Sequence, residues 1–139
     1  ECGRGAAEEA AAQADTFQVP PVQGRFEPDN AGELDLPDLT NALRSLMVRN
    51  MGIVRDQGGL LEAERQVAFW CRYVLRREFS TRAGWELQNL LTVGRLMIWS
   101  ALQRTESRGT HFRSDYPARD DANWVKHVVC PPSLPDKPQ

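Results

Sequence analysis

The 139-residue chain is long enough for one modest domain with a hydrophobic core. Its 17 Lys and Arg residues against 19 Asp and Glu residues give a net charge of −2, which provides no electrostatic reason to expect nucleic acid or an anionic membrane as a partner. No apolar run approaches the ~20 residues that a membrane-spanning helix needs. The widely spaced Cys2, Cys71 and Cys130 argue against a disulfide framework and a zinc site. We therefore expect no metal and a reducing, cytoplasmic setting.

The N-terminal residues are expected to contribute little to a core. Residues 1–15 are rich in Ala and Glu, which favour a helix, but they offer almost no large apolar face. The chain begins with Glu1 instead of Met, which indicates a fragment, and we expect this helix to be the remnant of a larger neighbouring domain. A frayed, solvent-exposed helix is the alternative. Residues 16–36 combine prolines with glycines and predict an extended linker.

Residues 37–109 are expected to form a three-helix bundle. Apolar residues recur at helical spacing over about residues 37–54, 60–78 and 83–106, and a Gly-Gly pair at 58–59 is interpreted as a break between the first two helices. Short turns between three such helices favour an up-down-up arrangement. The predicted fold class is all-α: a spectrin-repeat-like three-helix bundle with an N-terminal helix remnant and an irregular C-terminal tail.

The third predicted helix is apolar over more than half of its circumference, so we expect it to be covered on several sides. Leu90 and Ile98 are expected to be central to the core. The apolar residues of this helix are Trp85, Leu87, Leu90, Leu91, Val93, Leu96, Met97, Ile98, Ala101 and Leu102.

The helical pattern ends after Gly109. Residues 110–130 alternate charged, aromatic and small residues without a period, and four prolines between 131 and 138 predict an extended tail, so residues 110–139 are interpreted as an irregular docking segment and tail. No β-hairpin signal, phosphate-binding Gly-rich loop, GxSxG or HExxH motif is present. His127 is expected at the surface, because no second ligand lies at metal-binding spacing.

Charged side chains are concentrated in residues 104–121, and two interpretations compete for them. In one, Arg108, His111 and Arg113 form an anion site, because arginines bind carboxylates in a forked geometry and histidine can transfer protons. In the other, which we favour, these groups pair with nearby acidic residues and backbone, and they pin an irregular segment against another surface.

Three stretches resemble one enzyme family. They are MGIVRDQGGLLEA (51–63), ELQNLLTVGRLMIWSALQRTESRG (86–109) and THFRSDYP (110–117). They are similar to the C-terminal region of the flavoprotein family that comprises L-aspartate oxidase and the flavoprotein subunits of succinate dehydrogenase and fumarate reductase. The resemblance covers about residues 38–128, and its most specific part is the ESRG-H segment. The spacing from Gly52 to Glu106 is more similar to the oxidase, whereas RDDANWVKH (119–127) is more similar to the dehydrogenase subunits.

The resemblance implies an FAD-dependent parent enzyme, with L-aspartate oxidase as the first choice. Such an enzyme oxidises L-aspartate to iminoaspartate, which feeds quinolinate and NAD biosynthesis. The family's FAD-binding and catalytic residues lie in other domains and none maps onto this sequence. We therefore expect the chain to support the flavin domain, without binding FAD or catalysing a reaction by itself. A dehydrogenase or fumarate reductase flavoprotein subunit is the alternative.

The charged segment is expected to serve as an interdomain latch. The latch consists of Glu106, Arg108, His111, Arg113 and Asp115, and its expected partner is the FAD-binding domain of the same parent chain. A free-standing helical module that binds another protein through the same residues is the competing hypothesis. An FAD-binding Gly-rich motif upstream in the same reading frame would decide between the two.

Overall fold

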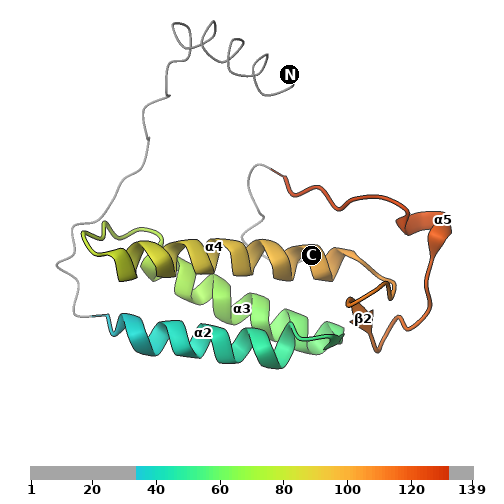
Figure 1. Cartoon of the computed structure of the whole chain (residues 1–139), viewed down its shortest axis with the longest axis horizontal. Coiled ribbons are helices and arrows are strands. Elements are labelled where there is room, and N and C mark those ends of the chain that lie inside the picture. The colour runs from blue at the N-terminus through green and yellow to red at the C-terminus, as the bar shows by residue number, and fades with distance from the viewer. Residues whose placement is uncertain (1–33, 132–139) are drawn as a thin grey trace, which may run out of the picture.

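The computed structural model describes residues 34–131. It contains helices α2 (Leu36–Asn50), α3 (Gln57–Val74), α4 (Arg82–Gln103) and the short α5 (Asp121–Trp124), together with two-residue strands β1 (Val54–Arg55) and β2 (Phe112–Arg113) (Figure 1). The predicted helix at 1–15, most of the predicted linker and the end of the Pro-rich tail lie outside the described residues. No helix in the described range is long and apolar enough to cross a membrane.

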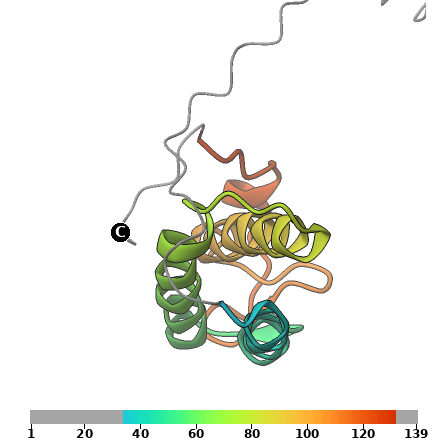
Figure 2. The same cartoon turned by 90° about the vertical axis from the view of Figure 1, so that its left-hand side faces the viewer.

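The three long helices form the predicted bundle. They alternate in direction along the chain (Figure 1), and their axes cross obliquely, so that α2 is viewed nearly end-on while α3 and α4 run across the view in Figure 2. Their facing sides build one continuous core. The buried apolar residues are Leu43, Leu46, Met51, Leu60, Ala63, Val67, Cys71, Val74, Phe79, Leu87, Leu91, Ile98 and Ala101. The all-α bundle is thus confirmed.

Each long helix begins directly after a side chain that accepts a hydrogen bond from its first turn. The Asp35 carboxylate accepts from the Asp38 amide at 2.9 Å, the Asp56 carboxylate from the Gly59 amide at 2.9 Å, and the Thr81 hydroxyl from the Gly84 amide at 3.4 Å. These contacts satisfy amide groups that have no partner within the helix.

The interpretation of the Gly-Gly pair as a break is wrong. Gly58 and Gly59 lie in the first turn of α3, which begins at Gln57 because Asp56 caps it. The break lies earlier: α2 ends at Asn50, and the following residues extend into β1. Two-residue β1 pairs in parallel with β2, with Val54 beside Phe112, a long-range contact that the sequence pattern did not predict.

The expectation that α4 is covered on several sides fails at Leu90. Its buried face carries Leu87, Leu91 and Ile98, but Leu90 is 38% exposed. Helices α2 and α3 lie on one side of α4, so they cover only part of an apolar circumference. Exposed large apolar residues on α4 are Trp85, Leu90, Val93 and Met97.

Gly84 permits the Phe79 ring to approach the helix backbone closely at the start of α4. The ring of Phe79, in the turn before the helix, packs directly against the Gly84 backbone, in the space that a Cβ would occupy. Gly94, nearly three turns later, has only ordinary contacts with Met47 and Leu43 at its hypothetical Cβ. Of these two α4 glycines, Gly84 is therefore the one that the packing requires.

Candidate functional site

Residues 104–126, the C-terminal segment, are attached to the end of the bundle by backbone hydrogen bonds. The Phe112 amide donates to the Ile53 carbonyl at 3.2 Å, and the Ser114 amide donates to the Arg55 carbonyl at 2.8 Å. A tight turn precedes β2, in which Gly109 adopts a φ of +59°, a conformation that favours glycine. The turn positions the charged side chains of the segment against α4 and the residues after α2.

Glu106 is the centre of one cluster of charges. Its side chain is fully buried, and its carboxylate accepts hydrogen bonds from Arg108 Nε at 2.8 Å, Arg108 Nη2 at 3.1 Å and Arg104 Nη1 at 2.5 Å. The Asp120 amide donates to the same carboxylate at 2.9 Å. These donors, Arg108 first among them, lower the pKa of Glu106 from 4.5 to about 2. The carboxylate is thus held ionised and its acceptor positions are occupied.

Arg113 is the centre of a second cluster. Its side chain is 1% exposed, and its guanidinium binds the Asp115 carboxylate in a two-point fork, Nε to Oδ1 at 2.8 Å and Nη2 to Oδ2 at 2.6 Å. Nη1 donates to the carbonyls of Ala101 at 2.9 Å and Arg104 at 3.3 Å, at the end of α4. Asp115 also accepts from the Gln57 amide at 3.1 Å, which ties this cluster to the start of α3.

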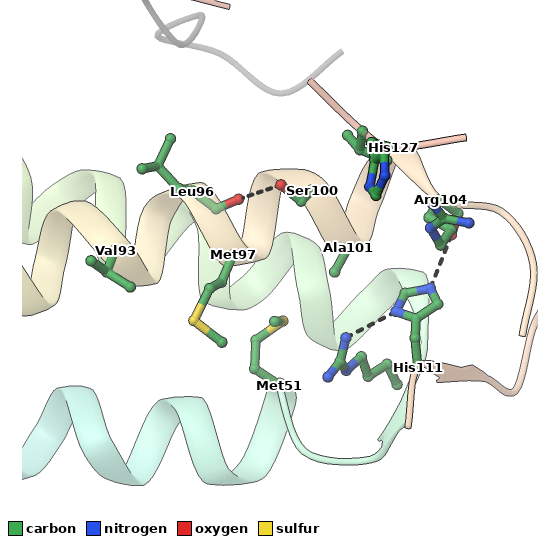
Figure 3. Close-up of a pocket in the computed structure, with 11 residues that line it drawn as sticks. Met51, Val93, Leu96, Met97, Ser100, Ala101, Arg104, His111 and His127 are labelled. Atoms are coloured by element: carbon green, nitrogen blue, oxygen red, sulfur yellow. Dashed lines mark hydrogen bonds between the residues drawn. The ribbon is translucent and has the colours of Figure 1, made fainter. Parts of the chain in front are cut away.

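His111 is held by two groups that fix its protonation. Arg55 Nη1 lies 2.9 Å from Nδ1, and the Arg104 carbonyl lies 3.3 Å from Nε2. Because a guanidinium can only donate and a carbonyl can only accept, these contacts require a neutral imidazole that carries its proton on Nε2 (Figure 3). Burial, reinforced by the charges of Arg55, Arg113 and Arg104, lowers the pKa of His111.

The predicted latch residues all lie in this region, but they form separate contacts. Glu106 pairs with Arg108, Arg113 pairs with Asp115, and His111 contacts Arg55 instead of a carboxylate. The alternative anion site of Arg108, His111 and Arg113 is not assembled, because both arginines are bound to carboxylates of the same segment. The favoured interpretation, pairing with acidic residues and backbone, agrees with this geometry.

Several participants lie within the charged stretch 104–121 but outside the predicted latch. Arg104 pairs with Glu106, donates to the carbonyls of Trp124 and Lys126, and stacks over the Trp124 ring at 5.2 Å. Asp121 accepts from Arg108 at 2.6 Å and from Arg119 at 2.7 Å. The aspartates at 120 and 121 were the available signal for these contacts. Asp120 caps the four-residue α5 by accepting a hydrogen bond from the Asn123 amide, and α5 begins at Asp121.

A groove lies beside His111, between α4 and the residues that follow α2. It encloses about 450 Å³. Figure 3 shows Met97 of α4 and Met51 pointing toward each other at one wall and His111 at the end nearer Arg104. The lining residues are Met51, Arg55, Val93, Leu96, Met97, Ser100, Ala101, Arg104, His111, His127 and Val128. His127 is exposed, as predicted, and is one of the residues that line the groove.

No cluster of His, Cys, Asp and Glu within residues 34–131 has the arrangement of a metal site. What the geometry provides instead is a set of arginine–carboxylate pairs that fix an irregular segment, and beside them a groove with basic and apolar walls. Such an arrangement can hold surfaces together.

Known proteins are similar to this chain in sequence. Residues 76–137 match the family model "Fumarate reductase flavoprotein C-term". The chain is 61% identical over 44 residues to the succinate dehydrogenase flavoprotein subunit of Coxiella burnetii, covering 32% of this chain and 8% of that protein. It is 49% identical over 100 residues to L-aspartate oxidase of Streptomyces coelicolor, covering 67% of this chain and 17% of that protein.

A solved structure is similar as well. Mycobacterium smegmatis Sdh1 in the apo form superposes with a TM-score of 0.58 and 31% sequence identity, over 86% of this chain and 20% of that chain. The present chain therefore corresponds to less than a quarter of the length of each of these proteins. Over residues 76–137 the chain matches the C-terminal domain of the fumarate reductase flavoprotein family, and the superposition on Sdh1 agrees with that match.

Proposed function

We propose that this chain is the C-terminal helical domain of an FAD-dependent L-aspartate oxidase, an enzyme that converts L-aspartate to iminoaspartate for quinolinate and NAD biosynthesis. The observation that carries the proposal is the 49% identity to the S. coelicolor oxidase, which extends over 100 residues and covers 67% of this chain. The parent enzyme would act in the cytoplasm and hold FAD in a separate domain of the same chain.

Within that enzyme, the chain supports the flavin domain and contributes no catalytic residue. The ionisable side chains of the C-terminal segment support this role, because the buried ones are engaged in structural pairs. Glu106 and Arg113 are each fully or almost fully buried and each binds an opposite charge. A general acid or base would instead need access to substrate.

In this proposal, the latch residues act through the shape that they give to the C-terminal segment. Its ion pairs close within the C-terminal segment and fix the shape of residues 104–126, and this fixed surface is the one that the flavin domain contacts. Asp115, which is 28% exposed in its side chain, and Phe112, which is 39% exposed, lie on the accessible side of the segment.

A succinate dehydrogenase or fumarate reductase flavoprotein subunit is the second candidate. It is favoured by the higher identity, 61%, to the C. burnetii dehydrogenase subunit, although that match extends over only 44 residues. The two candidates share the flavin and the domain organisation, but differ in substrate.

The purified, full-length parent protein decides between them. We expect a flavin absorbance spectrum and turnover of L-aspartate with oxygen or fumarate as acceptor, measured as peroxide or succinate formed. Succinate oxidation with an artificial acceptor, without L-aspartate turnover, would establish the second candidate. A full-length protein without flavin would refute both, and the free-standing interaction module would then be the better account.

A further inference from the structure

Arg55 carries a positive charge that no carboxylate balances within the described residues. Its Nε donates to the Gly52 carbonyl at 2.6 Å and its Nη1 to His111 at 2.9 Å, both of which are neutral acceptors. The side chain is partly buried, and the loss of hydration lowers the pKa of the guanidinium. A partly buried cation without a counter-charge is costly, so an anion bound beside Arg55 would stabilise the site.

The other arginines of this region do not share this property. Arg104 and Arg108 bind Glu106, and Arg113 binds Asp115. The contrast is informative because all four arginines lie at the same end of the bundle, and the fold supplies a carboxylate to three of them.

Arg55 lines the groove beside α4, and that groove has two kinds of wall. Its polar end is formed by Arg55, Arg104 and the two histidines, and no Asp or Glu lines the groove. Its apolar wall includes Val93, 53% exposed, and Met97, 46% exposed, both on the side of α4 that the bundle leaves uncovered. The occupant that complements both walls is a peptide segment in which a carboxylate is flanked by apolar side chains.

We infer that this groove is the docking site for such an acidic, apolar-flanked segment of the flavin domain, with its carboxylate bound to Arg55 and its apolar residues packed on Val93 and Met97. The inference rests on the proposed function in one respect, namely that a flavin domain belongs to the same parent chain. A small free anion would leave Val93 and Met97 uncovered, and a second copy of this domain would bring another basic groove instead of a counter-charge.

Site-specific cross-linking in the full-length flavoprotein tests the location of the segment. A photo-reactive phenylalanine analogue replaces Met97 in one variant and Val48 in a matched control, because Val48 is 78% exposed on α2 and does not line the groove. Mass spectrometry of the digest should map the Met97 cross-link to a flavin-domain peptide that contains Asp or Glu, with at least about tenfold less of that product from the Val48 variant. Cross-links to a second copy, to a peptide without Asp or Glu, or at no higher yield than the control overturn the inference.

Variants of Arg55 test whether its positive charge binds the acidic segment. Arg55→Gln keeps a hydrogen-bonding side chain but removes the charge, whereas Arg55→Lys keeps the charge. In Arg55→Gln, amide hydrogen exchange in the cross-linked flavin-domain peptide should accelerate by about tenfold or more, and in Arg55→Lys by clearly less. Reversing both partners, Arg55→Glu together with the mapped Asp or Glu changed to Arg, should restore slow exchange. Equal exchange in wild type and Arg55→Gln, or failure of the double reversal in a folded protein, overturns the inference.

The flavin content and the substrate of the same wild-type sample decide the proposed function separately. A flavin-containing enzyme in which the groove binds no acidic segment would refute only the docking site. A dehydrogenase with the expected cross-link would refute only the choice of oxidase.

Discussion

The bundle and the C-terminal segment lie side by side in one chain but are held by different interactions. Helices α2, α3 and α4 share a continuous apolar core in which residues such as Leu60, Leu87 and Ile98 are fully buried. The C-terminal segment contains one four-residue helix and two residues of strand, and its fully or almost fully buried side chains are charged: Glu106 and Arg113. Apolar burial is insensitive to pH, whereas paired charges are not. The comparison teaches that an irregular segment can have a defined shape when its charges satisfy one another.

The largest expected effect comes from removing a buried charge. Arg113→Ala leaves Asp115 without its forked partner and removes the side-chain donor to the Ala101 carbonyl at the end of α4. Breaking a buried pair from one side typically costs about 3–5 kcal/mol of unfolding free energy. Urea unfolding of the 139-residue chain measures this loss.

Arg119→Ala is the matched control, because Arg119 belongs to the same segment but its side chain is 63% exposed and that of its partner Asp121 is 55% exposed. Exposed pairs contribute about 0–1 kcal/mol. Equal losses in Arg113→Ala and Arg119→Ala would show that burial of the network does not stabilise this segment.

The core of the bundle should respond to loss of apolar volume. Ile98 is fully buried, so Ile98→Ala should cost about 2–5 kcal/mol. Leu90 lies on the same helix but is 38% exposed, so Leu90→Ala should cost less than about 1.5 kcal/mol in the isolated chain. Thermal and urea unfolding of the two variants measure the difference, and a larger loss at Leu90 would contradict the assignment of the buried face of α4.

The two buried glycines of α4 give a smaller contrast. Gly84→Ala places a methyl group in the space of the Phe79 ring, and such overpacking costs about 1–3 kcal/mol. Gly94→Ala meets only ordinary contacts and should stabilise the helix by about 0.5–1 kcal/mol. The sign of the change in melting temperature checks both, and destabilisation by Gly94→Ala as large as that by Gly84→Ala would be inconsistent with the packing described.

Acidification should separate the two regions without any substitution. The pKa of Glu106 is about 2 in the folded chain and near 4.5 without its partners, so its stabilising effect is present above about pH 4.5 and is lost as the pH falls toward 2. The indole NMR signal of Trp124, which stacks on Arg104, should shift in this range before the signals of the bundle core change. Glu106→Gln should already show the shifted signal at neutral pH. A Trp124 signal that stays unchanged while the core unfolds would contradict the comparison.

The sequence predicts the bundle well because its helices are marked by apolar periodicity and by capping side chains. Asp35, Asp56 and Thr81 are local signals, and α2, α3 and α4 begin directly after them. The misplaced break at 58–59 shows the weakness of reading glycines without the cap at Asp56. The exposure of Leu90 could not be inferred, since periodicity identifies an apolar face but not whether a neighbour covers it.

The site is less predictable because its contacts are long-range. Residue composition identified Glu106, Arg108, His111, Arg113 and Asp115 as one charged group. Their partners could not be assigned, because pairing depends on the turn at Gly109 and on the register of β1 against β2. Arg55 is 56 residues from His111 in the sequence, and no local pattern connects the two.

The central claim is that the charged network has a structural role and takes no part in the reaction, and Arg108→Ala in the full-length flavoprotein tests it most directly. The substitution removes the two-point contact with Glu106 and the contact with Asp121. We predict a lower melting temperature and weaker retention of flavin, while turnover per bound flavin stays within about tenfold of wild type. A loss of turnover beyond about a thousandfold, with unchanged melting temperature and flavin content, would contradict the account, because an effect of that size belongs to a group that acts on the transition state.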